Sequence, residues 1–199
     1  MRTFAAAESL LFTPHAPAAT DGLPTLRVIY AYPNTYTVGI CSLGYQLVWA
    51  ALATMPGLAV SRLFADAAEP LPADGVDVLG FSLSWELDYV GIMDTLEYLG
   101  VARRAVDRGD GEPLVFGGGP VLTANPEPYA PFFDIVLLGD GEESLGELMT
   151  SLRHSRADGV SRTEALRRAA RDVADPAAPT VLARSEERRV GKECRSRWS

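Results

Sequence analysis

The chain has 199 residues, of which 47% are hydrophobic and 22% charged, and its formal net charge at pH 7 is −8. This composition is typical of a globular protein with one domain of ordinary size. No stretch reaches the roughly 18 consecutive apolar residues of a membrane-spanning helix, and no secretory signal pattern opens the chain, so we expect a cytoplasmic protein without a membrane partner. The negative charge repels phosphate backbones, which argues against nucleic-acid binding by this domain.

Cysteine and histidine are too scarce for a disulfide framework or a zinc site, since the chain has only Cys41, Cys194, His15 and His154. An iron–sulfur cluster held by this sequence is not expected, because it would need at least three cysteine ligands. Cys41 precedes an expected helix, where the pKa of an exposed thiol would be lowered. Because its own loop holds no histidine partner, the simpler interpretation of Cys41 is a small buried hydrophobic residue.

The first half of the chain predicts two strands around a helix. Residues 1–25 are rich in alanine and proline and predict an irregular lead-in. The β-branched and aromatic run at 27–32 predicts a buried strand. Apolar residues recur at helical spacing from Leu43 until Pro56–Gly57 ends the helix. Residues 58–64 suit a second, shorter strand, for which we consider an edge position.

The second half continues the alternation of strands and helices. Val76–Ser82 predicts a buried strand, and the helix after it carries an apolar stripe of Leu87, Val90, Met93, Leu96 and Leu99. A fourth strand, PLVFGGG, ends in three glycines. The proline-dense stretch after it predicts at most about one helical turn, with Asn125 as its N-cap. DIVLLG predicts the fifth strand, and two helices follow, the second of them charged and spanning 162–172.

This order of elements predicts an α/β fold: a doubly wound, flavodoxin-like, Rossmann-type domain with a five-stranded parallel sheet and helices on both faces. We expect the domain at 26–155, followed by a helix and linker at 156–184. Ligands of this fold bind beyond the carboxyl ends of the strands. In this sequence those ends are NTYTVG, SLSWE, GGGP and GDGEE.

The last fifteen residues differ in character from the rest. Residues 185–199 hold eight charged residues and the only lysine of the chain, and their apolar positions follow no folding period. Two interpretations remain open. The tail is a solvated disordered end, or it is a non-native stretch of the kind that ends truncated environmental translations, so that the native part stops near Arg184.

Several strand-end residues are candidates for binding. Gly117–Gly119 would let a large group approach the backbone, although a sharp turn also explains them. Ser82 and Ser84 could donate hydrogen bonds into the same crevice or bond only to the local backbone. Glu86 and Asp88 could act as acid and base, but they also suit a helix start. The GDGEE loop matches neither a dinucleotide fingerprint nor a phosphate loop.

Three separate runs of the sequence, in this order, resemble the N-terminal cobalamin-binding-like domain of a family of radical S-adenosylmethionine (SAM) proteins: YPNTYTVG, GFSLSWELDY and GGGPVLTANPEPYAPFFDIVLLGDGEE. The resemblance covers residues 27–154 and rests on GFSxxxExxY, GGP, NPEP and GxGE in that order. It implies a domain that works against a C-terminal radical SAM barrel as its partner. In that family a CxxxCxxC motif of the barrel holds the 4Fe–4S cluster that cleaves SAM. The resemblance therefore places SAM and the cluster in a part C-terminal to this sequence.

The resemblance also suggests a cobalamin site with altered chemistry. Cobalamin domains of this fold carry D-x-H-x-x-G, then, about 42 residues on, S-x-L or a similar run, and then a later Gly-Gly. Laid on this chain, these motifs fall on Asn34, Tyr36, Gly39, Ser82, Ser84, Gly117, Gly118 and Gly119. Tyr36 replaces the histidine that ligates cobalt, and Asn34 replaces the aspartate that orients it. A neutral tyrosine, with a pKa of about 10, is a poor ligand near neutral pH, so the resemblance implies histidine-off cobalamin or a scaffold without it.

Two functional hypotheses follow. The first is the N-terminal part of a radical SAM enzyme, which binds a corrinoid without histidine ligation or scaffolds the barrel. The alternative is a ligand-free flavodoxin-like interaction module that packs against a catalytic partner. Both predict an exposed apolar patch at one end of the sheet. Whether the chain belongs to an enzyme stays open at this point, because the cluster motif is not in the sequence.

Overall fold

The computed structural model describes residues 16–139, 142–173 and 181–183. Its strands are β1 (Leu26–Tyr32), β2 (Leu58–Phe64), β3 (Val78–Ser82), β4 (Leu114–Gly118), β5 (Ile135–Leu137) and β6 (Val181–Ala183). Its α-helices are α2 (Tyr36–Gly39), α3 (Leu43–Thr54), α4 (Tyr89–Tyr98), α5 (Pro120–Ala124), α6 (Glu142–Ala157) and α7 (Arg162–Asp172). Short 3-10 helices are η1 (Glu86–Asp88), η2 (Ala105–Asp107) and η3 (Ala130–Phe132). The expected tail at 185–199 and residues 1–15 of the lead-in lie outside the described residues.

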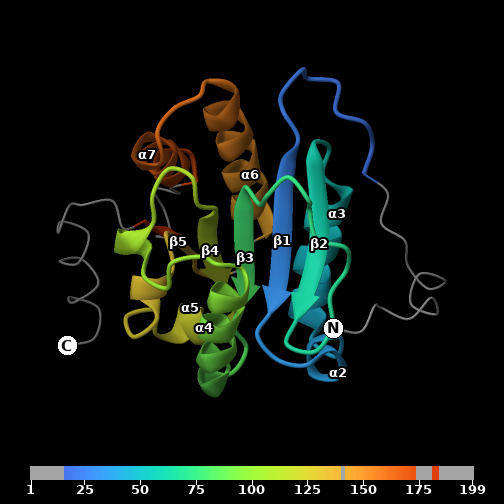
Figure 1. Cartoon of the computed structure of the whole chain (residues 1–199), viewed down its shortest axis with the longest axis vertical. Helices are drawn as coiled ribbons and strands as arrows, with labels where there is room; N and C mark the ends of the chain where they lie inside the picture. The colour runs from blue at the N-terminus through green and yellow to red at the C-terminus, as the bar shows by residue number, and fades with distance from the viewer. Residues whose placement is uncertain (1–15, 140–141, 174–180, 184–199) are drawn as a thin grey trace.

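The strands form one sheet in the order β2-β1-β3-β4-β5-β6 (Figure 1). Strands β1 to β5 pair in parallel, and their order is that of flavodoxin-like folds, which confirms the predicted fold class. Strand β6 pairs antiparallel with β5, in a stretch that the sequence predicted as linker. Helices α6 and α7 separate β5 from β6, so the pair is not a hairpin and the doubly wound arrangement holds.

Helices cover both faces of the sheet, as expected. Side chains of a strand alternate between the faces, so Val28 and Tyr30 pack with α3, α6 and α7, whereas Ile29 and Ala31 pack with α4 and α5. The edge position of β2 is confirmed, although β2 is as long as β1. Part of its open edge is covered by its own connection to β3, through an antiparallel bridge from Leu63 to Ala68 and a hydrogen bond from Phe64 N to the Ala67 carbonyl.

The predicted core face of the helix after β3 was wrong for two residues. Ile92 and Leu96 are fully buried, but Leu87 is 82% exposed and Val90 51% exposed. The 3-10 turn η1 precedes α4 and has three residues per turn, which breaks the 3.6-residue period that linked Leu87 to the rest of the stripe. The helix is also drawn close to the loop after β1, since a Cβ at Gly91 would lie 2.1 Å from the Pro33 carbonyl oxygen.

Of two smaller predictions, one is confirmed and the other was wrong. Asn125 ends α5 and, as predicted, also caps the single turn after it, because its side chain accepts a hydrogen bond from the Glu127 amide at 3.3 Å and the Ala130 amide donates to the Pro126 carbonyl oxygen. Cys41 is exposed and not buried, because it lies in the turn between α2 and α3. Its thiol lies 3.3 Å from the Thr37 carbonyl oxygen.

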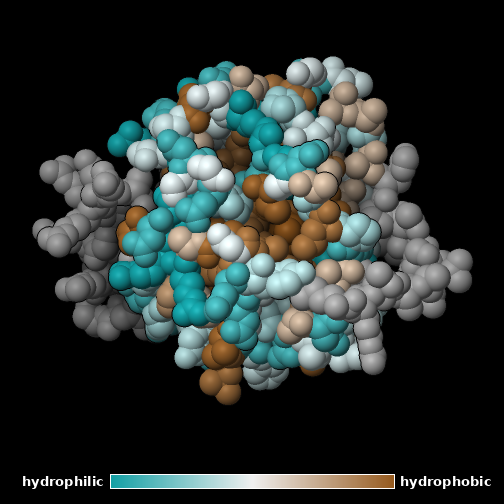
Figure 2. All heavy atoms as spheres, in the orientation of Figure 1, coloured by the Kyte–Doolittle hydropathy of each residue, from teal (hydrophilic) through white to brown (hydrophobic). Residues whose placement is uncertain are grey.

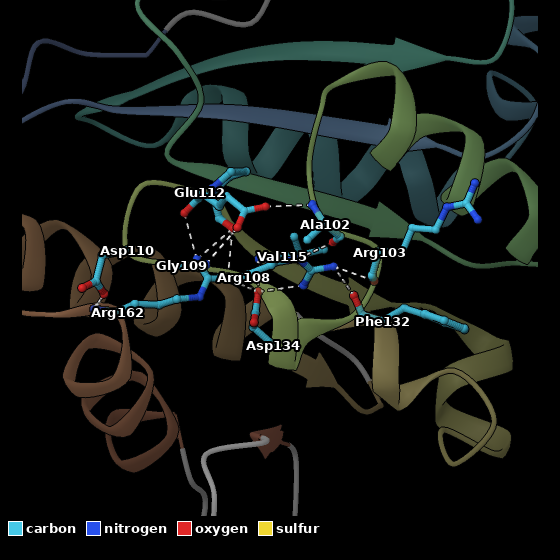
Figure 3. A network of polar contacts seen from close by, with 11 residues as sticks. Ala102, Arg103, Arg108, Gly109, Asp110, Glu112, Val115, Phe132, Asp134 and Arg162 are labelled. Atoms are coloured by element: carbon cyan, nitrogen blue, oxygen red, sulfur yellow. Dashed lines mark hydrogen bonds and ion pairs between the residues drawn. The ribbon is translucent and has the colours of Figure 1, made fainter.

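A buried ion-pair network joins the amino ends of β4 and β5 to α7 (Figure 3). The Asp134 carboxylate accepts hydrogen bonds from Arg108 Nη1 at 3.0 Å, Arg162 Nη2 at 2.5 Å and the Val115 amide at 2.7 Å. Arg108 also donates to the carbonyl oxygens of Ala102, Arg103 and Phe132. Burial lowers the pKa of the Arg108 guanidinium, although Asp134 opposes the shift, and the group stays charged.

Candidate functional site

The carboxyl ends of β1 and β3 are adjacent in the sheet, and the loops that follow them meet there. This is the switch point of the strand order, where the fold predicts a ligand crevice. Asn34, after β1, donates from Nδ2 to Asp88 Oδ1, after β3, at 2.9 Å. Its own Oδ1 accepts from the Thr35 amide at 2.7 Å. The side-chain amide that the cobalamin motif places beneath a corrin ring therefore joins two loops of the protein.

Tyr36 and Gly39 lie against the end of β2. The Tyr36 ring contacts Phe64 edge-on with a centroid distance of 5.3 Å, and its amide donates to Asp66 Oδ1 at 2.6 Å. Gly39 is buried, and a Cβ there would lie 2.5 Å from the Phe64 ring and 2.9 Å from Tyr32. The loop is thus packed onto aromatic side chains of the core.

Ser82 is buried beneath the same edge, where its side chain hydrogen-bonds to Tyr30. Burial raises the pKa of the Tyr30 hydroxyl above its ordinary value, and the bond with Ser82 offsets part of this shift. Tyr30 is stacked between Tyr45, at 4.8 Å, and Phe116, at 6.4 Å. These rings fill the space below Ser82 on the face covered by α3, whereas Ser84 is half-buried in the loop after β3.

The three glycines after β4 differ in what surrounds them. A Cβ at Gly117 would lie 2.7 Å from the Phe133 ring and 2.8 Å from Leu122. Gly119 has a φ of +111°, and a Cβ there would lie 2.7 Å from the Leu83 carbonyl oxygen. Gly118, which pairs with Ser82, would meet nothing closer than 3.8 Å. The sequence correctly indicated a close approach here, but at Gly117 and Gly119 the approaching atoms belong to the protein itself.

The eight predicted residues therefore line one edge of the sheet without forming an open cradle. The space around Gly39, Ser82, Gly117 and Gly119 is occupied by Phe64, the tyrosine stack, Phe133 and the Leu83 backbone. These surroundings do not fit a corrinoid, which needs room for both its ring and its nucleotide tail. Among the described residues, no group of three His, Cys, Asp or Glu side chains could hold a metal ion.

Large apolar side chains are exposed at the same edge. We define the carboxyl-edge surface as Val38, Leu43, Leu47, Trp85, Leu87, Tyr89 and Val90, whose exposed fractions range from 40% to 82%. Figure 2 shows apolar atoms that project at the bottom of the view, where α4 lies in Figure 1. This agrees with the apolar patch expected at one sheet end. Sequence periodicity missed Leu87 and Val90 as part of it because both matched a helical core stripe.

Asp88 is the one buried acid at this surface, within the part of the chain that the structure describes. It is 9% exposed, and its Oδ1 accepts the Asn34 hydrogen bond. Its Oδ2 is buried with no hydrogen-bond partner among the described residues. Although Asp88 precedes α4, its side chain makes no capping bond. A buried carboxylate oxygen without a donor is rare in native structures and requires an explanation.

A cavity of about 180 Å³ lies at the opposite, amino edge of the sheet. Its charged lining is satisfied by the protein, since Asp77 pairs with Arg27 and Arg156, and Arg162 pairs with Asp134. It contains none of the residues predicted from the sequence. No described helix is both long and apolar enough to cross a membrane.

Comparison with known proteins gives one match. A family model described as radical SAM proteins, N-terminal, matches residues 63–174, which is more than half of the chain. The matched segment begins within β2 and includes Ser82, Asp88 and the three glycines, but not Asn34, Tyr36 or Gly39. No curated protein and no solved structure matches the chain.

Proposed function

The chain belongs to the family of radical SAM proteins, as their N-terminal domain, and from this premise we propose that it packs against the barrel that binds SAM and the 4Fe–4S cluster. Membership implies both cofactors in the whole protein, where the cluster supplies the chemistry that cleaves SAM. The printed sequence has two cysteines, fewer than the three that the cluster motif needs. The domain's own contribution is therefore a docking surface and a rigid support.

The observation that carries this proposal is the carboxyl-edge surface. Burying one leucine or aromatic side chain fully contributes about 1.5–3 kcal/mol relative to leaving it in water. Leu87 is 82% exposed and Trp85 is 64% exposed, so most of this burial free energy is still available to a binding partner. Tryptophan, tyrosine and methionine are enriched in the buried centres of interfaces, and Trp85 and Tyr89 fit that role. A partner that covers this edge would also enclose the strand ends.

The packing of the predicted cofactor residues supports a domain that works without a corrinoid. Tyr36 is held on Phe64, and Ser82 is bonded to Tyr30. Gly117 and Gly119 are needed by the protein's own contacts. A module that packs against an unrelated partner remains the alternative, but the family match favours the radical SAM barrel.

Hydroxocobalamin provides a direct test of the corrinoid-free proposal. We expect no spectral change when it is added to the purified chain at up to millimolar concentration, where even ~4 kcal/mol of binding would be visible. The double variant Asn34→Asp with Tyr36→His should also give no change, because restoring the ligand does not open the filled space. A cobalamin domain with an intact D-x-H-x-x-G motif is the positive control. A histidine-ligated spectrum in the double variant would show that the site accepts a corrinoid.

Docking is tested by titrating the chain with the radical SAM barrel of the same parent protein. Leu87→Ser should weaken binding about tenfold or more, the equivalent of ~1.5 kcal/mol or more of lost burial. Its thermal stability should stay within about 0.5 kcal/mol of the parent, because Leu87 is exposed. Val106→Ser is the matched control. Val106 is also an exposed apolar residue, at 72% exposed, but it lies in η2, which follows the C-terminal end of α4 and is not part of the carboxyl-edge surface.

Two results would contradict the docking proposal. One is equal binding by Leu87→Ser and the parent chain, which would mean that the barrel does not cover this edge. The other is a continued reading frame that encodes no CxxxCxxC motif. Calorimetric titration measures the first, and sequencing of the coding DNA settles the second.

A further inference from the structure

Charge is unevenly distributed over the described part of the domain. Exposed or half-exposed arginines lie at the amino edge of the sheet, in the last turns of α6 or on α7: Arg27, Arg103, Arg104, Arg156, Arg167, Arg168 and Arg171. The described connections at the carboxyl edge carry Asp66, Glu86, Asp88 and Glu127 and no basic residue. Arg62, near the end of β2, is buried, paired with Glu69 and stacked on Trp49 at 3.8 Å. The carboxyl-edge surface therefore combines apolar side chains with negative charge only.

Asp88 adds a second and independent indication of what binds there. Its buried Oδ2 has no donor among the described residues, and its one side-chain partner, Asn34, is neutral. Gly91 allows α4 to lie close to the loop after β1, because a Cβ there would lie 2.1 Å from the Pro33 carbonyl oxygen. Trp85, Leu87 and Tyr89 are close neighbours of Asp88 in the sequence, and all three side chains are exposed. A partner that covers these three side chains would therefore also lie close to Asp88.

We propose that the barrel face that docks here presents an arginine or lysine side chain, set among apolar residues, toward Glu86 and Asp88. The proposal rests on the docking function above and adds the chemistry of the partner. A cationic side chain complements the charges of Glu86, which is exposed, and of Asp88, which is buried and has only a neutral side-chain partner. A protein surface fits better than a small cation, because Trp85, Leu87, Tyr89 and Val90, which neighbour these acids in the chain, are large, apolar and exposed. Nucleic acids and anionic membranes are excluded by the same negative charge.

The test measures how the affinity of the chain for the barrel depends on salt and on one exposed charge. Affinity of the parent chain should fall at least about tenfold between 50 and 500 mM NaCl, because salt screens charges near the rim of an interface. Glu86→Lys should bind about tenfold more weakly than the parent at low salt and nearly as well at high salt. Asp107→Lys makes the same change of charge in η2, outside the docking surface, and should bind within about twofold of the parent.

The outcomes separate this inference from the docking function itself. If the parent chain binds with an affinity that salt and Glu86→Lys leave unchanged, the cationic partner is wrong and docking stands. If the parent chain binds at neither salt concentration, the docking function is wrong. Asp88→Asn keeps the acceptor for Asn34 but removes the charge, so it should also weaken binding at low salt. Recovery of Glu86→Lys binding by an arginine-to-glutamate or lysine-to-glutamate change in the barrel would identify the partner residue.

Discussion

Replacing Asp134 with alanine is expected to destabilise the domain by about 3–5 kcal/mol, the cost of removing one member of a buried ion-pair network. The change leaves two buried guanidinium groups, those of Arg108 and Arg162, without their shared carboxylate. It also removes the hydrogen-bond acceptor of the Val115 amide, near the amino end of β4. In a domain of this size each kcal/mol lowers the melting temperature by roughly 2–4 °C, so a loss of about 10 °C is expected.

The control for this experiment is an exposed ion pair of similar chemistry. Arg103 and Glu97 are in contact at 2.6 Å, but their side chains are 58% and 69% exposed. Glu97→Ala should change stability by less than about 0.5 kcal/mol, because water already solvates both charges. Thermal or urea unfolding measures both variants. A loss below about 1 kcal/mol for Asp134→Ala would mean that water reaches the two arginines in solution.

Adjacent glycines after β4 should respond oppositely to the same substitution. Gly119→Ala is expected to cost about 2–4 kcal/mol, because an L-residue is strained at φ +111° and its Cβ would press on the Leu83 backbone. Gly118→Ala should be neutral or slightly stabilising, since its Cβ would make only ordinary contacts with Leu137, at 3.8 Å from the carbonyl oxygen and 4.0 Å from Cβ, and alanine lowers the entropy of the unfolded chain. Denaturant unfolding of the two variants gives the comparison.

The comparison tests whether the conformation at Gly119 and its contact with Leu83 exist in solution. Equal and small effects at both positions would mean that the loop accepts a side chain at Gly119, contrary to the close approach in the structure.

The sequence was sufficient to predict the central architecture because its strands are short apolar runs bounded by turn residues. RVIYAY and VDVLGFS are continuous β-branched and aromatic segments, typical of parallel strands buried on both faces. Strand β6 was missed because three residues in an alanine- and proline-rich stretch carry too little pattern. The exposure of Leu87 was missed because Leu87 lies in η1, where 3-10 geometry changes the helical phase that sequence periodicity assumes.

The candidate site was only partly readable for a different reason. The sequence correctly placed Ser82 and the glycines at one edge of the sheet, because strand ends in a parallel sheet lie together. It could not show which atoms fill the space beside them, since Phe64, Phe133 and Leu83 come from distant parts of the chain. The same holds for Asp134, whose contacts with Arg108 and Arg162 span 26 and 28 residues. Such side-chain pairs leave no periodic signal.

The two outer strands also affect how the domain meets other chains. An open strand edge is a template on which a second molecule can add a strand, and long flat edges promote aggregation. Here β5 is covered by the three-residue strand β6, and β2 is partly covered by its own connection through the Leu63–Ala68 bridge. Both lateral borders of the sheet are therefore poor templates for strand addition. Association is directed to side chains at the strand ends, where a partner is selected by shape and charge and not by backbone pairing.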